Sequence, residues 1–592
     1  MKLIKTLIIL PFLIIAFVGC GDDDEDKAST LSSKKVLELT LSYDIRVGET
    51  LTFNASDNWT VSDVNNAMIS LSKTSGGSGE NSIVVKAKDY NCTNEDAHYS
   101  FTITSGNGHG ANDIKVNITH EPVFIVESLI YEAKAQGDII DVHVKSKALA
   151  NPRNEIYVFF DSTSDAEKMI QNFTDEELSK SQAKRVDGNM QYLGNATLTR
   201  ASNSPEEATF HVKIAPNNTS SIRKGVFAFS VGERTGMFSD GIMITQLPAN
   251  AYHSQDMSQD GKVTPILKHK KGNGVPIVIM GDGFLDRDIT SGKYREATNK
   301  AIDGLFSMHP MKALKDYFDV YEVNAVSYND YFTSTSNTAF SSRFTSFTST
   351  EIKGDDSKVK EYAKKAIDEK RIDDALIIVL INDNRYAGTC SMCMDSKESD
   401  IPNGNSIAYV PLSESNEEQM MFSTVLCHEA IGHGFAKLAD EYDNIIYEKI
   451  PDDEKQDIIN RQKAGGYRNV ALDPDVTKSY WADFAADSRY NSERLGCYEG
   501  GATYALGVYR PTENSIMNDN IGGFNVAGRV MIYKRCMKIA LGKSWNFNLA
   551  DFITFDLENG KATSNKRNAP AKHSGNFRPL AAPKVTIMKT AK

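Results

Sequence analysis

The chain has 592 residues, a formal net charge of −12 and a pI of about 5.5, with 40% hydrophobic and 24% charged residues. This is a globular composition, and the length allows about three or four domains. The acidic balance argues against nucleic acid as a partner, because binding to phosphates requires a concentrated basic surface.

Residues 1–19 are typical of an export signal rather than of a folded domain. A positively charged start precedes the apolar run 7–18, which is too short to span a membrane. A small residue directly before Cys20 resembles the lipobox of bacterial lipoproteins. The resemblance implies lipidation of Cys20, an anchor in the outer membrane and a surface-exposed protein of the cell envelope, with 20–33 as an acidic tether. A plain secretory signal is the alternative.

Residues 34–122 and 123–249 are each predicted to form an all-β (Ig-like) sandwich, because short alternating segments are separated by glycine and polar turns. Trp59, a Ser/Gly-rich turn and the closing strand make the first region resemble the BACON type of β-sandwich; in the second, only the closing strand does so. The resemblance implies contact with carbohydrate. Spacers that hold a catalytic domain away from the membrane are the alternative, since a lone tryptophan is normally part of the core.

The sequence pattern is different over residues 250–560, where apolar runs typical of buried strands alternate with helical segments. Strands are predicted over 275–280, 317–326, 375–381 and 406–411, and helices over 294–306 and 359–370. This order indicates a mainly parallel α/β sheet. Residues 561–592 are predicted to form a basic tail that lies outside the site.

The chemistry is concentrated in Cys427–Tyr442, which reads CHEAIGHGFAKLADEY. His428 and His433 stand five residues apart. On a regular α-helix, residues four apart lie about 40° apart around the axis, but residues five apart lie about 140° apart. A capping box predicts that the helix begins near Asn416. The extra residue then predicts a π-bulge near Gly432, where glycine relaxes the backbone.

The segment Lys437–Tyr442 after the histidines resembles the M64 metallopeptidase family, which is named for a bacterial immunoglobulin A peptidase. Further matching segments are Gly281-Asp282-Gly283, Asn382, Tyr386-Ala387-Gly388, residues 498–501, 507–511 and 515–517. The resemblance implies an α/β zincin domain of the metzincin-like type and a catalytic Zn²⁺. It also implies an endopeptidase that acts on extracellular proteins, with immunoglobulin A and mucosal glycoproteins as candidate substrates.

Two imidazoles and a carboxylate are the protein ligands that catalytic zinc uses, together with a water. His428 and His433 are the first two candidates. The third is Asp440, with Glu441 and Glu499 as alternatives, because the next histidine in the chain is His573 in the basic tail.

Glu429 is the predicted general base, which takes a proton from metal-activated water and passes it to the leaving amine. Tyr442, Tyr504 and Tyr509 are unranked candidates for stabilising the transition state. Met517 resembles the methionine of a Met-turn beneath the metal. We expect the substrate to lie extended along an edge strand of the sheet.

The irregular histidine spacing motivates an alternative from another class, a surface lipoprotein that binds glycan or protein and carries an inactive zincin-like domain. A metal centre that hydrolyses a small ester or a glycan is a third interpretation. Six cysteines besides Cys20 permit disulfides in an exported protein, and their pairing stays open.

Overall fold

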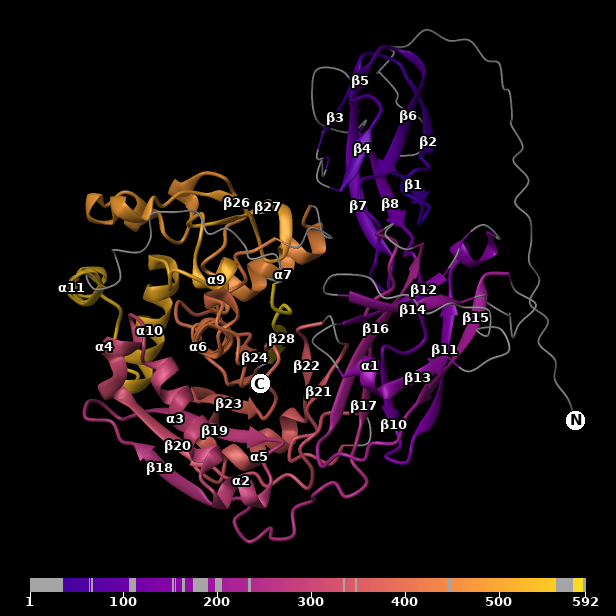
Figure 1. Cartoon of the computed structure of the whole chain (residues 1–592). Helices are drawn as coiled ribbons and strands as arrows, with labels where there is room; N and C mark the ends of the chain where they lie inside the picture. Colours follow the sequence, from indigo (N-terminus) through magenta and orange to yellow (C-terminus); the bar gives the residue numbers. More distant parts are fainter. Residues whose placement is uncertain are drawn as a thin grey trace, which may run out of the picture.

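The computed structural model describes residues 36–560 and 579–588, except 63, 65–67, 106–112, 152–153, 155, 162–164, 174–189, 197–204, 233–235, 334–335, 347–348 and 444–448. Cys20, the predicted signal and tether, and His573 lie outside the described residues. Two regions of β-sheet precede a mixed α/β region (Figure 1). None of the helices in the described ranges is long and apolar enough to cross a membrane.

The first β region consists of two sheets around one core, with strand orders β1-β8-β7-β3-β5 and β2-β6-β4. Its strands are β1 (Val36–Leu41), β2 (Glu49–Ala55), β3 (Trp59–Ser62), β4 (Ile69–Leu71), β5 (Ser75–Gly76), β6 (Gly79–Ala87), β7 (Ala97–Ser105) and β8 (Ile114–His120). Trp59 is 1% exposed, and its ring centroid lies 5.0 Å from that of Phe53. Trp59 is therefore a core residue and is not available to stack on a sugar.

The second β region repeats this arrangement with strand orders β10-β17-β16-β12-β14 and β13-β15-β11-β9. Its elements are β9 (Ile125–Val126), β10 (Ile130–Ala133), β11 (Asp138–Lys145), β12 (Ile156–Asp161), α1 (Ala166–Met169), β13 (Ile170–Phe173), β14 (Met190–Ala196), β15 (Glu207–Ile214), β16 (Arg223–Val231) and β17 (Ile242–Gln246). Alternate residues of β11 are buried, as expected for a strand with one face on the core.

The α/β region is built on a seven-stranded sheet with the order β18-β20-β19-β23-β25-β24-β28. Its strands are β18 (Val263–Leu267), β19 (Val275–Asp282), β20 (Phe318–Val323), β23 (Leu376–Ile381), β24 (Thr389–Asp395), β25 (Ser406–Pro411) and β28 (Lys584–Met588). The four strands from β20 to β25 in this order run parallel, β24 is antiparallel to β25, and β28 is parallel to β24. Residues 584–588 thus belong to this sheet, although the sequence predicted a tail outside the domain.

Helices pack on both faces of this sheet (Figure 1). Ile277 and Ile279 face the larger core, which includes the motif helix, whereas Val278 and Met280 face a second core with α5. The helices are α2 (Asp286–Thr290), α3 (Lys293–Leu305), α4 (Met311–Leu314), α5 (Asp356–Ala363), α6 (Phe422–Leu426), α7 (Asp452–Lys463), α8 (Ala482–Ala485), α9 (Ile516–Asp519), α10 (Val526–Leu541) and α11 (Leu549–Asn559). The strand pairs β21 (Arg343–Phe344) with β22 (Ile352–Lys353) and β26 (Tyr498–Gly501) with β27 (Tyr504–Arg510) complete the region.

The helix that leads into the motif begins later than predicted. The Ser415 hydroxyl accepts the N–H of Glu417 at 3.2 Å, and one 3-10 turn follows at Glu418–Met420. Met421 is extended, with ψ at 143°, and α6 begins after it at Phe422. The predicted capping box near Asn416 is therefore wrong, because extended backbone separates it from the helix.

An ion pair joins the second β region to the α/β region. Nζ of Lys224 on β16 lies 2.6 Å from Oδ2 of Asp383, which follows β23. Nε of Arg385 lies 3.3 Å from the other oxygen of the same carboxylate. Burial opposes ionisation of Asp383, but Lys224 and Arg385 lower its pKa to about 2. The loop after β23 is thus fixed partly from the neighbouring region.

The six cysteines in the described part of the chain are free thiols, so no disulfide joins these residues. Cys390 and Cys393 lie on β24, and Cys390 is fully buried beneath the motif helix. Burial raises the pKa of the Cys427 thiol to about 12, which makes it unreactive. Cys390, Cys427 and Cys536 are buried core residues, whereas Cys92, Cys393 and Cys497 are half-buried.

Candidate metal centre

The motif forms a π-helix over Cys427–Phe435 instead of an α-helix. One of its hydrogen bonds runs from the N–H of Ala436 to the carbonyl of Ile431, five residues earlier, at 2.8 Å. In this geometry residues five apart lie on one face. His428 and His433 are therefore neighbours, with ring centroids 4.7 Å apart. The predicted bulge is confirmed, and it extends over the nine residues Cys427–Phe435.

Gly432 serves a purpose different from the one predicted. A Cβ at this position would collide with Sδ of Met517 and would lie 2.9 Å from its Cε. Met517 is 1% exposed and lies on the short helix α9, against the π-helix. Glycine is required here because the two segments pack closely, and not because the backbone needs extra freedom.

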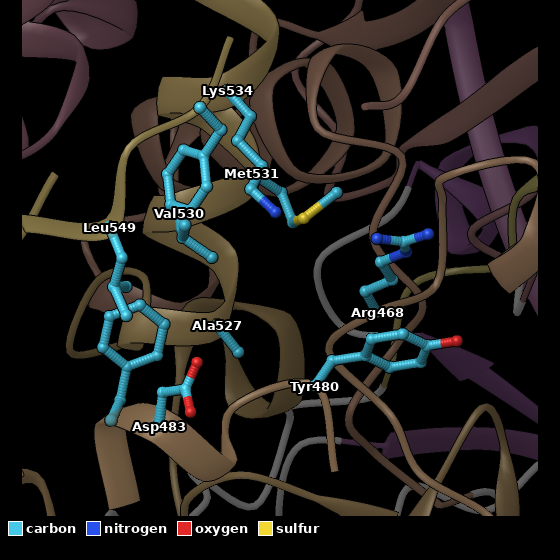
Figure 2. Close-up of a pocket in the computed structure, with 10 residues that line it drawn as sticks. Arg468, Tyr480, Asp483, Ala527, Val530, Met531, Lys534 and Leu549 are labelled. Atoms are coloured by element: carbon cyan, nitrogen blue, oxygen red, sulfur yellow. The ribbon is translucent and has the colours of Figure 1, made fainter. Parts of the chain in front are cut away.

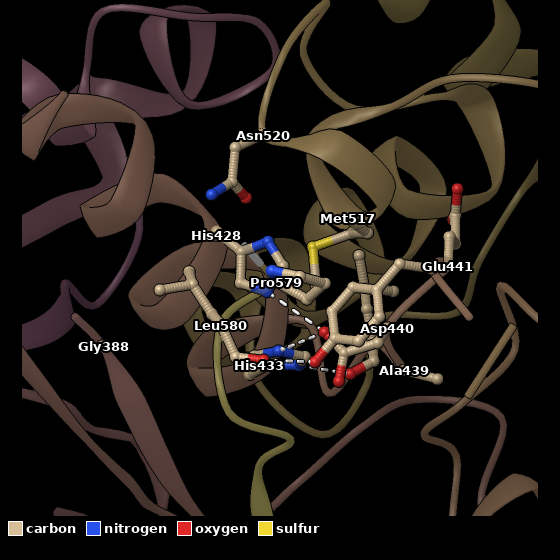
Figure 3. A network of polar contacts seen from close by, with 12 residues as sticks. Gly388, His428, His433, Ala439, Asp440, Glu441, Met517, Asn520, Pro579 and Leu580 are labelled. Atoms are coloured by element: carbon tan, nitrogen blue, oxygen red, sulfur yellow. Dashed lines mark hydrogen bonds and ion pairs between the residues drawn. The ribbon is translucent and has the colours of Figure 1, made fainter. Parts of the chain in front are cut away.

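Both histidines direct an unprotonated nitrogen toward Asp440. Nδ1 of His428 donates to the carbonyl of Ile516, and Nδ1 of His433 donates to the carbonyl of Leu438, each at 2.8 Å. Because a carbonyl only accepts, each neutral ring carries its proton on Nδ1 and keeps a lone pair on Nε2. Each Nε2 lies 3.2 Å from Oδ1 of Asp440 (Figure 3).

Asp440 is held in place through the backbone of the preceding residue, Ala439, which Asn469 binds. Oδ1 of Asn469 accepts the N–H of Ala439, and Nδ2 of Asn469 donates to the Ala439 carbonyl, both at 2.8 Å. Burial opposes ionisation of Asp440, whereas positive charge on the two histidines would lower its pKa. The amide of Asn469 thus fixes the backbone that presents the carboxylate.

Glu441 points away from the histidines and joins other partners. Its carboxylate accepts hydrogen bonds from Ser515 at 2.6 Å, from Asn525 at 2.9 Å and from Asn469 at 3.0 Å. Its N–H donates to the Met517 carbonyl at 2.7 Å. Burial raises the pKa of Glu441, while these donors lower it. Glu441 therefore positions the turn before α9, which orients the first histidine.

Glu429 is fully buried, and neither of its carboxylate oxygens has a hydrogen-bond partner in the described structure. Burial raises its pKa to about 8, whereas the positive charge of protonated His428 would lower it. The side chain packs closely against Gly388, where a Cβ would lie 2.8 Å from Cγ of Glu429. A buried carboxylate without partners is costly and is uncommon in folded proteins.

Glu499 lies away from this cluster, on the hairpin of β26 and β27. It is exposed, and its Oε1 accepts the N–H of Gly507 at 3.0 Å. Tyr504 and Tyr509 lie on β27 and are half-buried, and the hydroxyl of Tyr509 lies 3.4 Å from the Glu499 carboxylate. Of the three predicted tyrosines, Tyr442 alone adjoins Asp440 and Glu441 in the chain; it is 5% exposed, and burial raises its pKa.

Two residues of the predicted tail complete the site, and sequence reasoning missed them. Pro579 and Leu580 lie beside the two histidines and Asp440 (Figure 3). The carbonyl of Leu580 accepts the Tyr442 hydroxyl at 2.5 Å. The basic residues and prolines of residues 561–592 pointed to a solvated tail, and no regular apolar pattern around Leu580 indicated that it is buried.

A small pocket lies elsewhere in the α/β region, between α8, α10 and the start of α11 (Figure 2). Its lining residues are Arg468, Tyr480, Asp483, Phe484, Ala527, Val530, Met531, Lys534, Phe547 and Leu549. None of them belongs to the histidine cluster. The pocket is therefore separate from the candidate metal centre.

Residues 266–488 match the family model described as IgA Peptidase M64. These residues belong to the M64 peptidase family. The M64 match includes both histidines, Glu429 and Asp440, and it ends before Glu499 and Met517. No curated protein matches the chain.

Solved structures similar to parts of the chain have little sequence in common with it. CBD12 from CALX1.2 is 10% identical, covers 33% of this chain and 80% of its own, and has a TM-score of 0.14. The ectodomain of the teleost fish polymeric Ig receptor is 9% identical over 38% of this chain and 100% of its own, with a TM-score of 0.14. The D00-D0 domain of Intimin is 14% identical over 37% of this chain and 99% of its own, with a TM-score of 0.17. Scores this low support no argument about this chain.

The M64 metallopeptidase family implies a metal cofactor, and the residues present fit one. His428, His433 and Asp440 are the one group of three or more His, Cys, Asp or Glu residues within the described ranges that is placed to hold a metal ion. Their ligand atoms lie within 4.8 Å of one another, and each residue is at most 2% exposed. Two lone pairs and a carboxylate oxygen that converge in a buried site repel one another unless a cation lies between them.

Proposed function

We propose that this protein is a zinc endopeptidase whose metal is held by His428, His433 and Asp440. The observation that carries the proposal is the convergence of two unprotonated Nε2 atoms on Oδ1 of Asp440, each at 3.2 Å. Two histidines and a carboxylate are a ligand set of catalytic zinc. The Nδ1 bonds to backbone carbonyls fix the ring orientation, as hydrogen bonds to the other nitrogen of a metal-binding histidine do.

A bound zinc ion would supply positive charge that acidifies a water molecule and polarises a peptide carbonyl. Glu429 takes the proton of the attacking water on a carboxylate oxygen and then donates it to the nitrogen of the departing amine. Tyr442 donates a hydrogen bond to the carbonyl oxygen as negative charge develops on it. Water adds across one C–N bond, which yields a carboxylic acid and an amine.

The alternative of an inactive domain drew its support from the histidine spacing, and the π-helix removes that motivation because it brings both rings to one face. Extracellular proteins, including immunoglobulin A and mucosal glycoproteins, are the proposed substrates. Lipidation of Cys20 and a surface location at the outer membrane belong to the same proposal, which rests on the sequence before residue 34. Membrane fractionation of a Cys20→Ser protein tests the anchor, and unchanged membrane recovery would contradict it.

Metal removal tests the proposed function. We expect purified full-length protein to contain about one zinc per chain, measured by inductively coupled plasma mass spectrometry. Chelation followed by dialysis should reduce hydrolysis of labelled casein to background, and stoichiometric zinc, but not magnesium, should restore it. Cleavage that persists in metal-free protein would show that another group performs the reaction.

Substitution of Gly388 by alanine is expected to reduce catalysis without unfolding the protein. The added methyl group would lie 2.8 Å from Cγ and 2.9 Å from Oε1 of Glu429, so the carboxylate must move. We expect kcat/KM to fall by at least about tenfold, since small displacements of catalytic groups are costly. Zinc content should not change. A Gly77→Ala variant is the control for substitution of a glycine, because position 77 is exposed, its backbone is not left-handed, and the added Cβ meets only Oδ1 of Asn58 at 3.8 Å. Equal activity of Gly388→Ala and wild type would contradict this placement of Glu429.

A further inference from the structure

Residues 579–588 run from the candidate metal centre, where Pro579 and Leu580 lie, to the edge of the central sheet, which β28 extends (Figures 1 and 3). The side chain of Leu580 is 3% exposed, and its carbonyl accepts the Tyr442 hydroxyl. The carbonyl of Pro579 accepts the Thr350 hydroxyl at 3.3 Å. Strand β28 then pairs with β24 from Lys584 to Met588. The segment is therefore anchored both at the metal centre and along the sheet.

With the segment in place, the centre is closed. His428, Glu429, His433 and Asp440 are each at most 2% exposed. A polypeptide must bring a backbone carbonyl to these residues in order to be hydrolysed. Because Leu580 and its neighbours lie there, they have to move before a substrate can bind.

The segment uses the contacts that an extended polypeptide would use. Without β28, strand β24 would be the edge of the sheet, with unpaired N–H and carbonyl groups that can bind an extended chain. The Tyr442 hydroxyl, assigned above to the substrate carbonyl, is bound to the peptide carbonyl of Leu580. Nζ of Lys584 lies 3.1 Å from Oε1 of Glu351, which adds a charged contact outside the sheet.

We propose that residues 579–588 occupy the substrate groove in cis and hold the peptidase latent, so that an extended polypeptide binds beside β24 only after they leave. This inference rests on the proposed function. A tethered segment competes at an effective concentration on the order of millimolar, so a free peptide at micromolar concentration cannot displace it.

Two variants of the full chain should release the segment. The N–H of Ser396 donates to the Met588 carbonyl at 3.0 Å. Alternate residues of a strand face the same neighbour, so the N–H of Thr586 also faces β24, and Thr586→Pro would remove a donor to it. Leu580→Asp would place a charge at a position that is 3% exposed. Thr586→Val is the matched control, because it keeps the N–H and a β-branched side chain at an exposed position.

The first readout is binding. A fluorescein-labelled peptide with the sequence of residues 579–588, PLAAPKVTIM, is titrated by anisotropy into each variant in a Glu429→Gln background. We expect Thr586→Pro and Leu580→Asp to bind it at least tenfold more tightly than wild type and Thr586→Val do. Affinities within twofold of wild type for both variants, with unchanged circular dichroism and zinc content, would overturn the inference.

The second readout separates this inference from the proposed function. With Glu429 intact, casein hydrolysis by the two released variants should exceed that of wild type at least tenfold and should be sensitive to chelation. Tighter peptide binding without cleavage by any variant would support the groove assignment and contradict the peptidase. Equal chelator-sensitive cleavage by all variants would support the peptidase and contradict latency.

Discussion

Glu429→Gln protein should bind zinc as wild type does and lose nearly all hydrolytic activity. The amide has the size of the carboxylate but cannot accept a proton, and general acid–base catalysis contributes about 10²–10⁴-fold in rate. We therefore expect kcat/KM to fall by at least about 10²-fold, measured on a fluorogenic peptide. Stability should not fall, because both Glu429 oxygens already lack partners and are buried.

Zinc content and thermal stability are the controls for this experiment. Zinc content and the thermal unfolding midpoint of Glu429→Gln should equal those of wild type, which separates loss of the base from loss of the site. If the latent state limits wild-type activity, the comparison is made in the Thr586→Pro background. Undiminished hydrolysis by Glu429→Gln would disprove the assignment of Glu429 as general base.

Asp440→Asn protein should lose zinc affinity, whereas Glu499→Gln protein should keep it. An amide oxygen carries no charge to balance the cation, and even loss of a residue that only orients a metal ligand costs about 10–100-fold in metal affinity. We expect Asp440→Asn to bind zinc at least about 100-fold more weakly, measured by competition with a chromophoric chelator. Glu499 lies exposed on the hairpin of β26 and β27, so its replacement should change nothing.

Glu441→Gln provides the sharper comparison. Glu441 is as deeply buried as Asp440, at 1% and 2% exposure, but it binds Ser515, Asn469 and Asn525. Its replacement should lower stability through lost hydrogen bonds, while zinc still binds. Zinc loss in Glu441→Gln together with normal binding by Asp440→Asn would exchange the roles of the two carboxylates.

Much of the fold follows from the sequence where local pattern and burial agree. The apolar runs at 275–280 and 375–381 are the fully buried strands β19 and β23, because a parallel sheet covered on both faces needs apolar residues throughout. Strand β24 was not predicted, because Thr389–Asp395 mixes sulfur and hydroxyl side chains without a clear alternation. Strand β28 (KVTIM) was missed although Val585, Thr586 and Ile587 favour a strand, because the basic segment around it is typical of a solvated tail.

The convergence of the two histidines was predictable from the sequence, whereas the packing around them was not. The spacing of His428 and His433 required a distorted helix if both were to share a metal, and the π-helix follows from that requirement. The reason for Gly432 could not be found from the sequence, since it is contact with Met517, eighty-five residues later. The cover formed by Leu580 is another contact between distant segments, and local propensities contain no information about it.

The ion pair between Lys224 and Asp383 makes the two neighbouring modules dependent on each other's sequence. Asp383 is 8% exposed, and it opens the loop whose last residue, Gly388, packs against Glu429. An unrelated sandwich in place of the second one would lack Lys224. The buried carboxylate of Asp383 would then keep only one of its two cations, Arg385. Lineages that shuffle such modules would therefore be expected to carry this sandwich and this peptidase domain together, as one inherited unit.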